Sequence, residues 1–110
     1  MSTAAGGAAP AVRDNAAASR LEAGAGGELG YAEYLLAPGT VTFTHTRVPA
    51  SARGHGVGTQ LIEAGLELAR RRGLKVIPKC PFFATYMRTH PETHELLALE
   101  GRKFLDAPGT

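Results

Sequence analysis

The stretch Val48-Pro-Ala-Ser-Ala-Arg-Gly-His-Gly-Val-Gly-Thr-Gln-Leu61 decides how this chain folds. A β-rich run, residues 41–47, precedes it, and an amphipathic helical pattern, residues 57–72, follows without a gap. The glycines therefore lie in a loop that opens a helix, where unpaired backbone N–H groups and the positive end of the helix dipole favour a bound anion. Because glycine has no side chain, a diphosphate can approach this backbone closely. The sequence predicts a phosphorylated ligand at the loop.

The spacing of the glycines narrows the choice of ligand. A dinucleotide fingerprint needs glycines at the first, third and sixth positions, but the sixth position is Thr59 when counted from Gly54 and Leu61 when counted from Gly56. A nucleoside-triphosphate loop needs a lysine after its last glycine, and none of these glycines is followed by one. The pattern that remains is Arg53-x-x-Gly56-x-Gly58. A turn that only reverses the chain would require neither the arginine nor three alternating glycines.

Length and composition indicate one small globular domain. The chain has 110 residues, of which 44% are hydrophobic and 20% charged, as in ordinary globular proteins. The formal net charge is only +2, which gives no case for nucleic acid or for a membrane surface as a partner. The single cysteine, Cys80, excludes an intramolecular disulfide and favours a cytoplasmic location. We expect a monomer or weak dimer.

The domain boundaries follow from composition. Residues 1–14 are rich in alanine and glycine and are expected to form a disordered leader. Residues 15–99 are expected to form the domain, and residues 100–110 a C-terminal tail.

Hydrophobic periodicity predicts an α/β domain with a mixed sheet in the order β-β-β-α-β-α. The expected strands are residues 17–22 (weakly patterned), 28–36, 40–48 and 74–79, and the expected helices are residues 57–72, 82–90 and 92–99. The first three strands form an antiparallel meander, and the last runs parallel to its predecessor because a helix connects them. Phe82 and Phe83 are both expected in the core.

A second group of residues begins where the last strand ends, in the segment Cys80-Pro-Phe-Phe-Ala-Thr-Tyr-Met-Arg-Thr-His-Pro-Glu92. Ligands of open α/β sheets bind at the carboxyl ends of the strands, and the glycine loop leaves its own strand at the same edge. We therefore expect Cys80 and the anion site to share one crevice. Tyr86, six residues further on, falls close to the face that is turned toward the start of its helix.

These two motifs resemble a known family. Arg53-x-x-Gly56-x-Gly58 resembles the pyrophosphate loop of the GNAT acetyltransferase superfamily, and Cys80-Pro-Phe, Tyr86 and His90-Pro-Glu92 resemble its small GNAT-like family. The resemblance covers roughly residues 15–98. It implies the acyl-CoA N-acyltransferase fold, truncated after the last core helix, and acetyl-CoA or CoA as the cofactor.

The resemblance also implies roles for individual residues. The loop would bind pyrophosphate mainly through backbone N–H groups, at Arg53, Gly54, His55, Gly56, Val57, Gly58 and Thr59. Thr46, Arg47 and Val48, at the splayed end of the central strand, would bind the pantetheine arm and the acetyl carbonyl. Tyr86 would protonate the departing CoA thiolate, or Cys80 would attack the thioester to give an acetyl-enzyme. His45 or His90 would be the base, because imidazole titrates near neutral pH.

The function implied is acetyl-CoA-dependent N-acetylation of an amine. Because the expected truncation leaves the acceptor site open, a lysine of a protein or peptide suits it better than a small metabolite. Two alternatives remain: a CoA- or acyl-CoA-binding module without catalysis, and an interaction domain with a relic loop.

Each candidate residue also has a purely structural interpretation. Cys80 can be a small buried hydrophobe, Tyr86 can pack only through its ring, and His45 can be a hydrogen-bonded core histidine. His90 and His94 have the spacing of a metal pair, but Pro91 follows His90 directly and other ligands are scarce, so no metal is expected.

Overall fold

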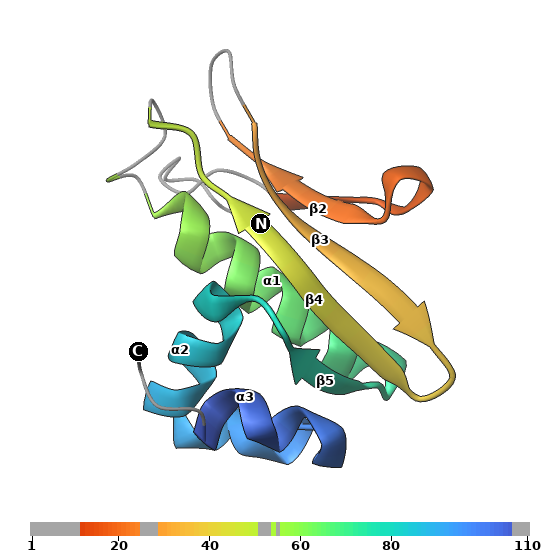
Figure 1. Cartoon of the computed structure of the whole chain (residues 1–110). Helices are drawn as coiled ribbons and strands as arrows, with labels where there is room; N and C mark the ends of the chain where they lie inside the picture. Colours follow the sequence, from red (N-terminus) through yellow and green to blue (C-terminus); the bar gives the residue numbers. More distant parts are fainter. Residues whose placement is uncertain (1–11, 25–28, 51–53, 55, 107–110) are drawn as a thin grey trace.

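A sheet with helices packed on one of its faces forms the domain (Figure 1). The computed structural model describes residues 12–24, 29–50, 54 and 56–106. The strands are β1 (Val12–Asn15), β2 (Arg20–Ala23), β3 (Gly30–Ala37), β4 (Thr40–Arg47) and β5 (Lys75–Pro78). The α-helices are α1 (Val57–Arg72), α2 (Pro81–Thr89) and α3 (Arg102–Asp106). Short 3₁₀ helices are η2 (Ala16–Ala18), η4 (Pro91–Leu96) and η5 (Leu99–Gly101).

The strands follow one another across the sheet in chain order, β1-β2-β3-β4-β5. Pairing is antiparallel from β1 to β4, whereas β4 and β5 are parallel because α1 connects them. The predicted mixed α/β sheet, with the antiparallel meander β2–β3–β4 and the parallel strand β5, is confirmed.

The N-terminal part of the sheet differs from the prediction. The weak strand expected at residues 17–22 is the 3₁₀ segment η2 followed by β2, and a further strand, β1, precedes it. The Asn15 side chain accepts a hydrogen bond from the Ala18 N–H at 3.2 Å, and Ser19 takes a left-handed conformation with φ 53°, so the chain reverses. Residues 12–14, assigned to the leader by composition, therefore lie in β1. Their order comes from pairing with β2, which composition does not reveal.

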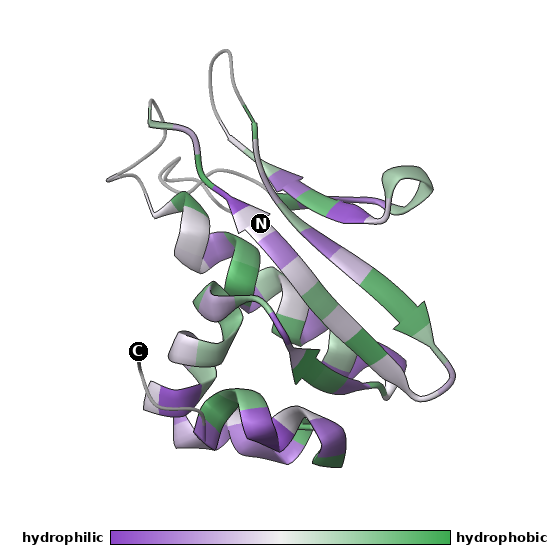
Figure 2. Cartoon of the chain, in the orientation of Figure 1, coloured by the Kyte–Doolittle hydropathy of each residue, from purple (hydrophilic) through white to green (hydrophobic). Residues whose placement is uncertain are grey.

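Helix α1 covers the inner face of the sheet with its apolar stripe, as predicted. Its buried residues are Val57, Leu61, Ile62, Gly65, Leu66, Leu68 and Ala69, and Figure 2 shows hydrophobic and hydrophilic bands alternating along it. The helix ends at Gly73, whose N–H bonds the last carbonyls from a left-handed conformation with φ 67°. Within the described residues, no helix has the combination of length and hydropathy that crossing a membrane requires.

The centre of the core is a stacked aromatic pair. Phe43 of β4 and Phe83 of α2 lie face to face, with ring centroids 4.0 Å apart and an interplanar angle of 5°. Gly65 of α1 lies against both rings: a Cβ added there would be 2.8 Å from Phe43 Cζ and 3.0 Å from Phe83 Cε2. The strand and the two helices therefore meet at this point, and the absence of a side chain at residue 65 allows the contact.

The C-terminal part of the chain packs back onto β5. The helix expected over residues 92–99 is instead η4, after which Leu97 forms a parallel bridge with Val76 and the Ala98 N–H bonds the Val76 carbonyl at 2.8 Å. The expected tail, residues 100–110, includes η5 and α3, and Gly101 lies against Pro78. This pairing covers the edge of β5, since an apolar strand left unpaired would expose its backbone.

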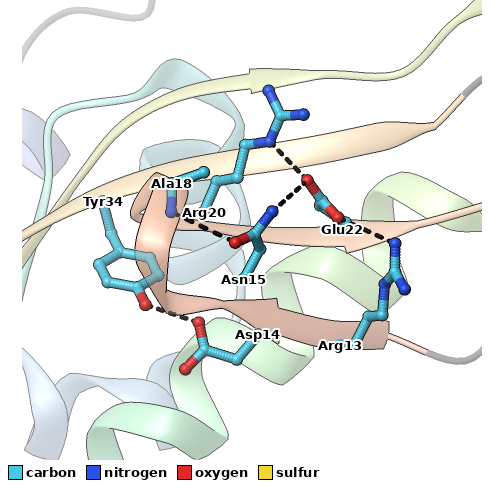
Figure 3. Close-up of polar contacts among 7 residues, drawn as sticks. All are labelled: Arg13, Asp14, Asn15, Ala18, Arg20, Glu22 and Tyr34. Atoms are coloured by element: carbon cyan, nitrogen blue, oxygen red, sulfur yellow. Dashed lines mark hydrogen bonds and ion pairs between the residues drawn. The ribbon is translucent and has the colours of Figure 1, made fainter.

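A charged cluster joins β1 and β2 on the outer face of the sheet, opposite α1 (Figure 3). Glu22 is only 3% exposed, and its carboxylate accepts hydrogen bonds from Arg20 Nε at 2.7 Å, Arg13 Nη2 at 3.1 Å and Asn15 Nδ2 at 3.1 Å. The hydrogen bond from Arg20, then that from Asn15, lowers the pKa of Glu22 below its usual 4.5.

Gly65→Ala is expected to destabilise the core. The clash with the stacked rings costs about 1–3 kcal/mol, of which the better helix propensity of alanine restores about 1 kcal/mol. We expect a net loss of up to about 2 kcal/mol in the free energy of unfolding, measured by urea titration. Gly58→Ala on the same helix is the control, because its Cβ would lie 3.4 Å from Val48 Cγ2, an ordinary contact. Equal urea midpoints for Gly65→Ala and Gly58→Ala would contradict this prediction, because they would show that the two rings move aside at no cost in stability.

The Glu22 cluster makes stability sensitive to acid. Because the pKa of Glu22 is lower in the folded protein than in the unfolded chain, its contribution is complete above about pH 4.5 and is lost as the pH falls through the folded pKa. Glu22→Gln should therefore unfold more easily than the wild type at pH 7, and its urea midpoint should fall less between pH 7 and pH 3. Glu100→Gln, which removes an exposed carboxylate outside the sheet, controls for net charge. If the urea midpoints of the wild type and Glu22→Gln fell by the same amount between pH 7 and pH 3, Glu22 would not be the source of the acid sensitivity.

Candidate functional site

The glycine loop meets α1 as the sequence predicts. Gly56 is the N-terminal cap of α1 and, like Gly54, has a left-handed conformation, with φ 77° and 85° respectively. Among the described residues, no side chain caps the first turn at Gly56, and the leading N–H groups of α1 suit an anion. The predicted contributions of Arg53 and His55 lie outside the described residues.

Two adjoining grooves begin at this helix start. The first, called here the loop groove, has a volume of about 360 Å³ and is lined by Val48, Gly54, Gly56, Val57, Gly58, Thr59 and Phe82. The second, the interhelical groove, has about 600 Å³ and is lined by Gly58, Thr59, Ile62, Pro81, Phe82, Thr85, Tyr86 and Thr89. They share Gly58, Thr59 and Phe82 and therefore adjoin; the two open grooves together, from the loop to the surface between α1 and α2, are called the channel here.

The position of Phe82 differs from the prediction. It was expected in the core together with Phe83, but its side chain is 47% exposed and forms part of both grooves. Successive helical residues point about 100° apart, so only one of the two phenylalanines can face the sheet. The helical spacing carried this signal: Phe83 and Met87 form the buried face, whereas Phe82 shares its side of the helix with Thr85, Tyr86 and Thr89.

The two central strands separate next to this channel. Strand β5 pairs with β4 from Thr40 to Phe43, and the Cys80 N–H then donates to the Phe43 carbonyl at 2.8 Å. Strand β4 continues to Arg47, and within the described chain this second half pairs with β3 but not with β5. Beyond this point β4 and the segment that leads into α2 diverge (Figure 1), and the gap between their backbones contains the buried Cys80 and Thr46 side chains. The resemblance to GNAT enzymes implied such a splayed strand.

A bulge in β4 decides which side chains face this gap. The β3–β4 register runs from Glu33 opposite His45 to Tyr34 opposite Phe43, so Thr44 is an extra residue in β4. The extra residue reverses the alternation along the strand. As a result Thr46 is buried on the inner face, whereas His45 and Arg47 are exposed on the outer face.

Cys80 and Thr46 come together where the strands separate. The Cys80 thiol is 2% exposed and donates a hydrogen bond to Thr46 Oγ1 at 3.3 Å. Cys80 is also the N-terminal cap residue of α2, and its carbonyl accepts the Ala84 N–H at 3.0 Å. Cys80 was expected to share one crevice with the anion site, but it is buried and lines neither groove; its contact is with Thr46 instead.

Tyr86 lies in the interhelical groove rather than beside Cys80. Its hydroxyl donates to Glu63 Oε2 of α1 at 3.2 Å, and its ring stacks on His90 with centroids 3.8 Å apart. Burial, followed by the Glu63 and Glu92 carboxylates, raises the pKa of Tyr86. The phenol is therefore protonated at neutral pH, the form that a general acid requires. Sequence reasoning did not single out Glu63, because its partner comes from another helix.

The two candidate histidines lie away from the Cys80–Thr46 pair. His45 points to the outer face, with its ring centroid 6.0 Å from that of Tyr31. His90 ends α2, ten residues after Cys80, which corresponds to about 15 Å along a helix. Its Nδ1 lies 2.7 Å from the Tyr86 carbonyl oxygen.

The described residues contain no candidate metal site. No group of three His, Cys, Asp or Glu side chains lies close enough together there to hold an ion. His94 Nε2 lies 2.7 Å from the Met87 carbonyl oxygen, so its ring packs against the end of α2.

The comparison with known families agrees with this arrangement. The family model described as GCN5-related N-acetyl-transferase matches residues 19–96, which run from the residue before β2 to the end of η4. The chain therefore belongs to the GCN5-related N-acetyltransferase family. Membership suggests acetyltransferase activity and an acyl-CoA substrate. None of the curated proteins compared with the chain matches it.

Proposed function

We propose that this protein is an acetyl-CoA-dependent N-acetyltransferase whose acceptor is an amine, specifically a lysine of a protein or peptide. The observation that carries the proposal is the pair of adjoining grooves that lead from the N-terminus of α1, past Val48 just beyond β4, to the surface between α1 and α2. A CoA thioester needs an anion site for its diphosphate and a narrow, partly apolar path for its arm, and the channel offers both.

The residues of the channel suit CoA chemically. The N–H groups at Val57, Gly58 and Thr59 would bind the diphosphate, helped by the helix dipole. The unpaired β5 side of residues 46–48 would hydrogen-bond the pantetheine amides, as an added strand does in a sheet. Phe82 offers an exposed ring on which the arm or the adenine can pack.

Direct transfer requires a proton donor for the leaving thiolate. In this route the lone pair of the amine attacks the thioester carbonyl carbon, the C–S bond breaks, and the thiolate takes a proton. Tyr86, with its raised pKa, would supply that proton and regain one from the solvent. The excess proton of the amine passes to a base, for which His45 and His90 remain candidates.

Covalent transfer would use Cys80. Its sulfur would attack the thioester, CoA would leave as the thiol, and the amine would then take the acetyl group from the cysteine. The position of Cys80 at the strand separation supports this route. Its burial, and the hydrogen bond that it donates to Thr46, require the side chain to be released first.

An open acceptor side supports a polypeptide substrate. Beyond α2, the described chain adds a single bridge at Leu97 to the edge of β5, and no further strand rises beside the gap. A lysine at the end of its four-carbon side chain can reach a shallow site from a polypeptide that stays on the surface.

The same burial of Cys80, together with the engagement of Tyr86 by Glu63, favours a second candidate function: a CoA-binding module without transfer. Such a module needs the channel but neither the thiol nor the phenol. The two functions make the same prediction for binding and opposite predictions for turnover.

Binding is tested by thermal shift with CoA, acetyl-CoA and NAD. We expect CoA and acetyl-CoA to stabilise the protein, by about 2.7 kcal/mol at one hundred times Kd, and NAD to have no effect. Gly58→Val should abolish the stabilisation, because Gly58 lines both grooves. Gln60→Val, on the same helix but in neither groove, should retain it. A protein that responds to none of the three ligands would contradict both CoA functions.

The route is tested by release of free CoA with a lysine peptide, in wild type, Cys80→Ser and Tyr86→Phe. A covalent route predicts an acetyl adduct on intact wild-type protein and loss of turnover in Cys80→Ser. Direct transfer predicts no adduct and a fall in kcat of about a hundredfold in Tyr86→Phe, with CoA affinity unchanged. If no amine is acetylated and neither variant alters CoA affinity, the protein is the binding module.

A further inference from the structure

The outer face of the sheet is uncovered within the described part of the chain. Helices α1 and α2 both pack on the inner face, as the contacts of Phe43 with Gly65 and Phe83 show. In Figure 1, α1 runs behind β4, and no helix of the described chain lies over the near face of β2, β3 and β4. A sheet face that stays open in a small domain needs polar side chains or a partner.

Arginines gather on this open face next to the candidate site. Arg13 of β1 and Arg20 of β2 flank Glu22, and Arg47 of β4 lies opposite Tyr31 of β3 in the strand register. Arg20 also stacks over the Tyr31 ring, 4.7 Å from its centroid. The row therefore crosses the sheet from β1 to the splayed end of β4.

The buried carboxylate of Glu22 holds Arg13 and Arg20 in place without using all their donors. A guanidinium has five N–H donors, and the bond from Arg20 uses only Nε, while that from Arg13 uses Nη2. Figure 3 shows the Nη atoms of Arg20 turned away from Glu22. Arg13 is 73% exposed. Fixed, outward-facing guanidinium groups suit the bidentate binding of carboxylates.

The charges of the face are unbalanced toward the positive. Glu22 is engaged by two arginines, which leaves Glu33 as the other acidic residue beside Arg13, Arg20 and Arg47 on this part of strands β1 to β4. Neighbouring strands lie about 4.8 Å apart, so the row spans about 10 Å from Arg47 on β4 to Arg20 on β2. An extended polypeptide covers this distance with about three residues.

We propose that the arginine row on the outer face binds aspartate or glutamate side chains of the acceptor polypeptide, so that acidic residues about three positions from the target lysine select the substrate. The inference rests on the proposed transferase function for its kinetic consequence, but the docking itself does not require turnover. The row ends at Arg47, one residue from Thr46, which contacts Cys80, so a polypeptide docked along it ends beside the part of β4 that is not paired with β5 in the described chain.

The docking is tested by fluorescence anisotropy without CoA. A labelled lysine peptide with glutamates three positions before and after the lysine is compared with the same peptide carrying glutamines, and with a single-stranded oligonucleotide. We expect the acidic peptide to bind at least about tenfold more tightly than the glutamine peptide, with an affinity that falls as salt rises. Equal affinity for the two peptides, or tighter binding of the oligonucleotide, would overturn the proposal.

Variants show whether the arginine row is responsible. Arg13→Gln and Arg47→Gln should each lower the affinity for the acidic peptide by about three- to tenfold. Arg71→Gln, which removes an arginine of nearly equal exposure from an ion pair on α1, should leave its affinity unchanged. Urea titration of Arg13→Gln checks folding, because Glu22 keeps Arg20 and Asn15. Equal losses in all three variants would overturn the assignment to this face.

Kinetics separate this inference from the proposed function. If the transferase proposal holds, the acidic peptide should have the higher kcat/KM, and Arg13→Gln should reduce that preference through KM. Acetylation of both peptides with equal kcat/KM would overturn the docking inference while supporting the transferase. Selective binding of the acidic peptide without any acetylation would support the docking inference and contradict the transferase proposal.

Discussion

Phe43 and Phe83 stack face to face in the core, and the arrangement of the candidate site depends on this contact. Phe43 also accepts the Cys80 N–H through its carbonyl oxygen, so the same residue fixes the side chain of α2 and the backbone that precedes it. Gly65 allows α1 to approach both rings. The starts of the two helices are thereby held side by side, and the channel lies between them.

The bulge at Thr44 is the second constraint, and it divides the site between two faces of one strand. Without the extra residue, the alternation along β4 would turn His45 inward and Thr46 outward. With it, Thr46 meets Cys80 on the helix side, while His45 and Arg47 join the arginines of the outer face. One inserted residue therefore gives the proposed cofactor side and the proposed acceptor side different chemistry.

Sequence reasoning was reliable where a local pattern carries the signal. The helical stripe of residues 57–72, the glycine that ends it and the parallel strand after it all follow from periodicity and from known capping chemistry. It failed where contacts between segments that are distant in the sequence determine the structure. Strand β1 is ordered by pairing with β2, and Leu97 by a bridge to β5. Phe82 lies in the groove because the helix turns only Phe83 toward the sheet.

The sequence by itself determined the mixed α/β sheet, the loop that opens α1 and the family to which the chain belongs, because these depend on residue type and on spacing along the chain. Only the tertiary structure decided which candidates meet. It joined Cys80 to Thr46 and Tyr86 to Glu63, and it placed His45 on the opposite face. The reason is physical: a hydrogen bond between distant segments depends on register, bulges and helix packing, and none of these can be read from the spacing of residues along one chain.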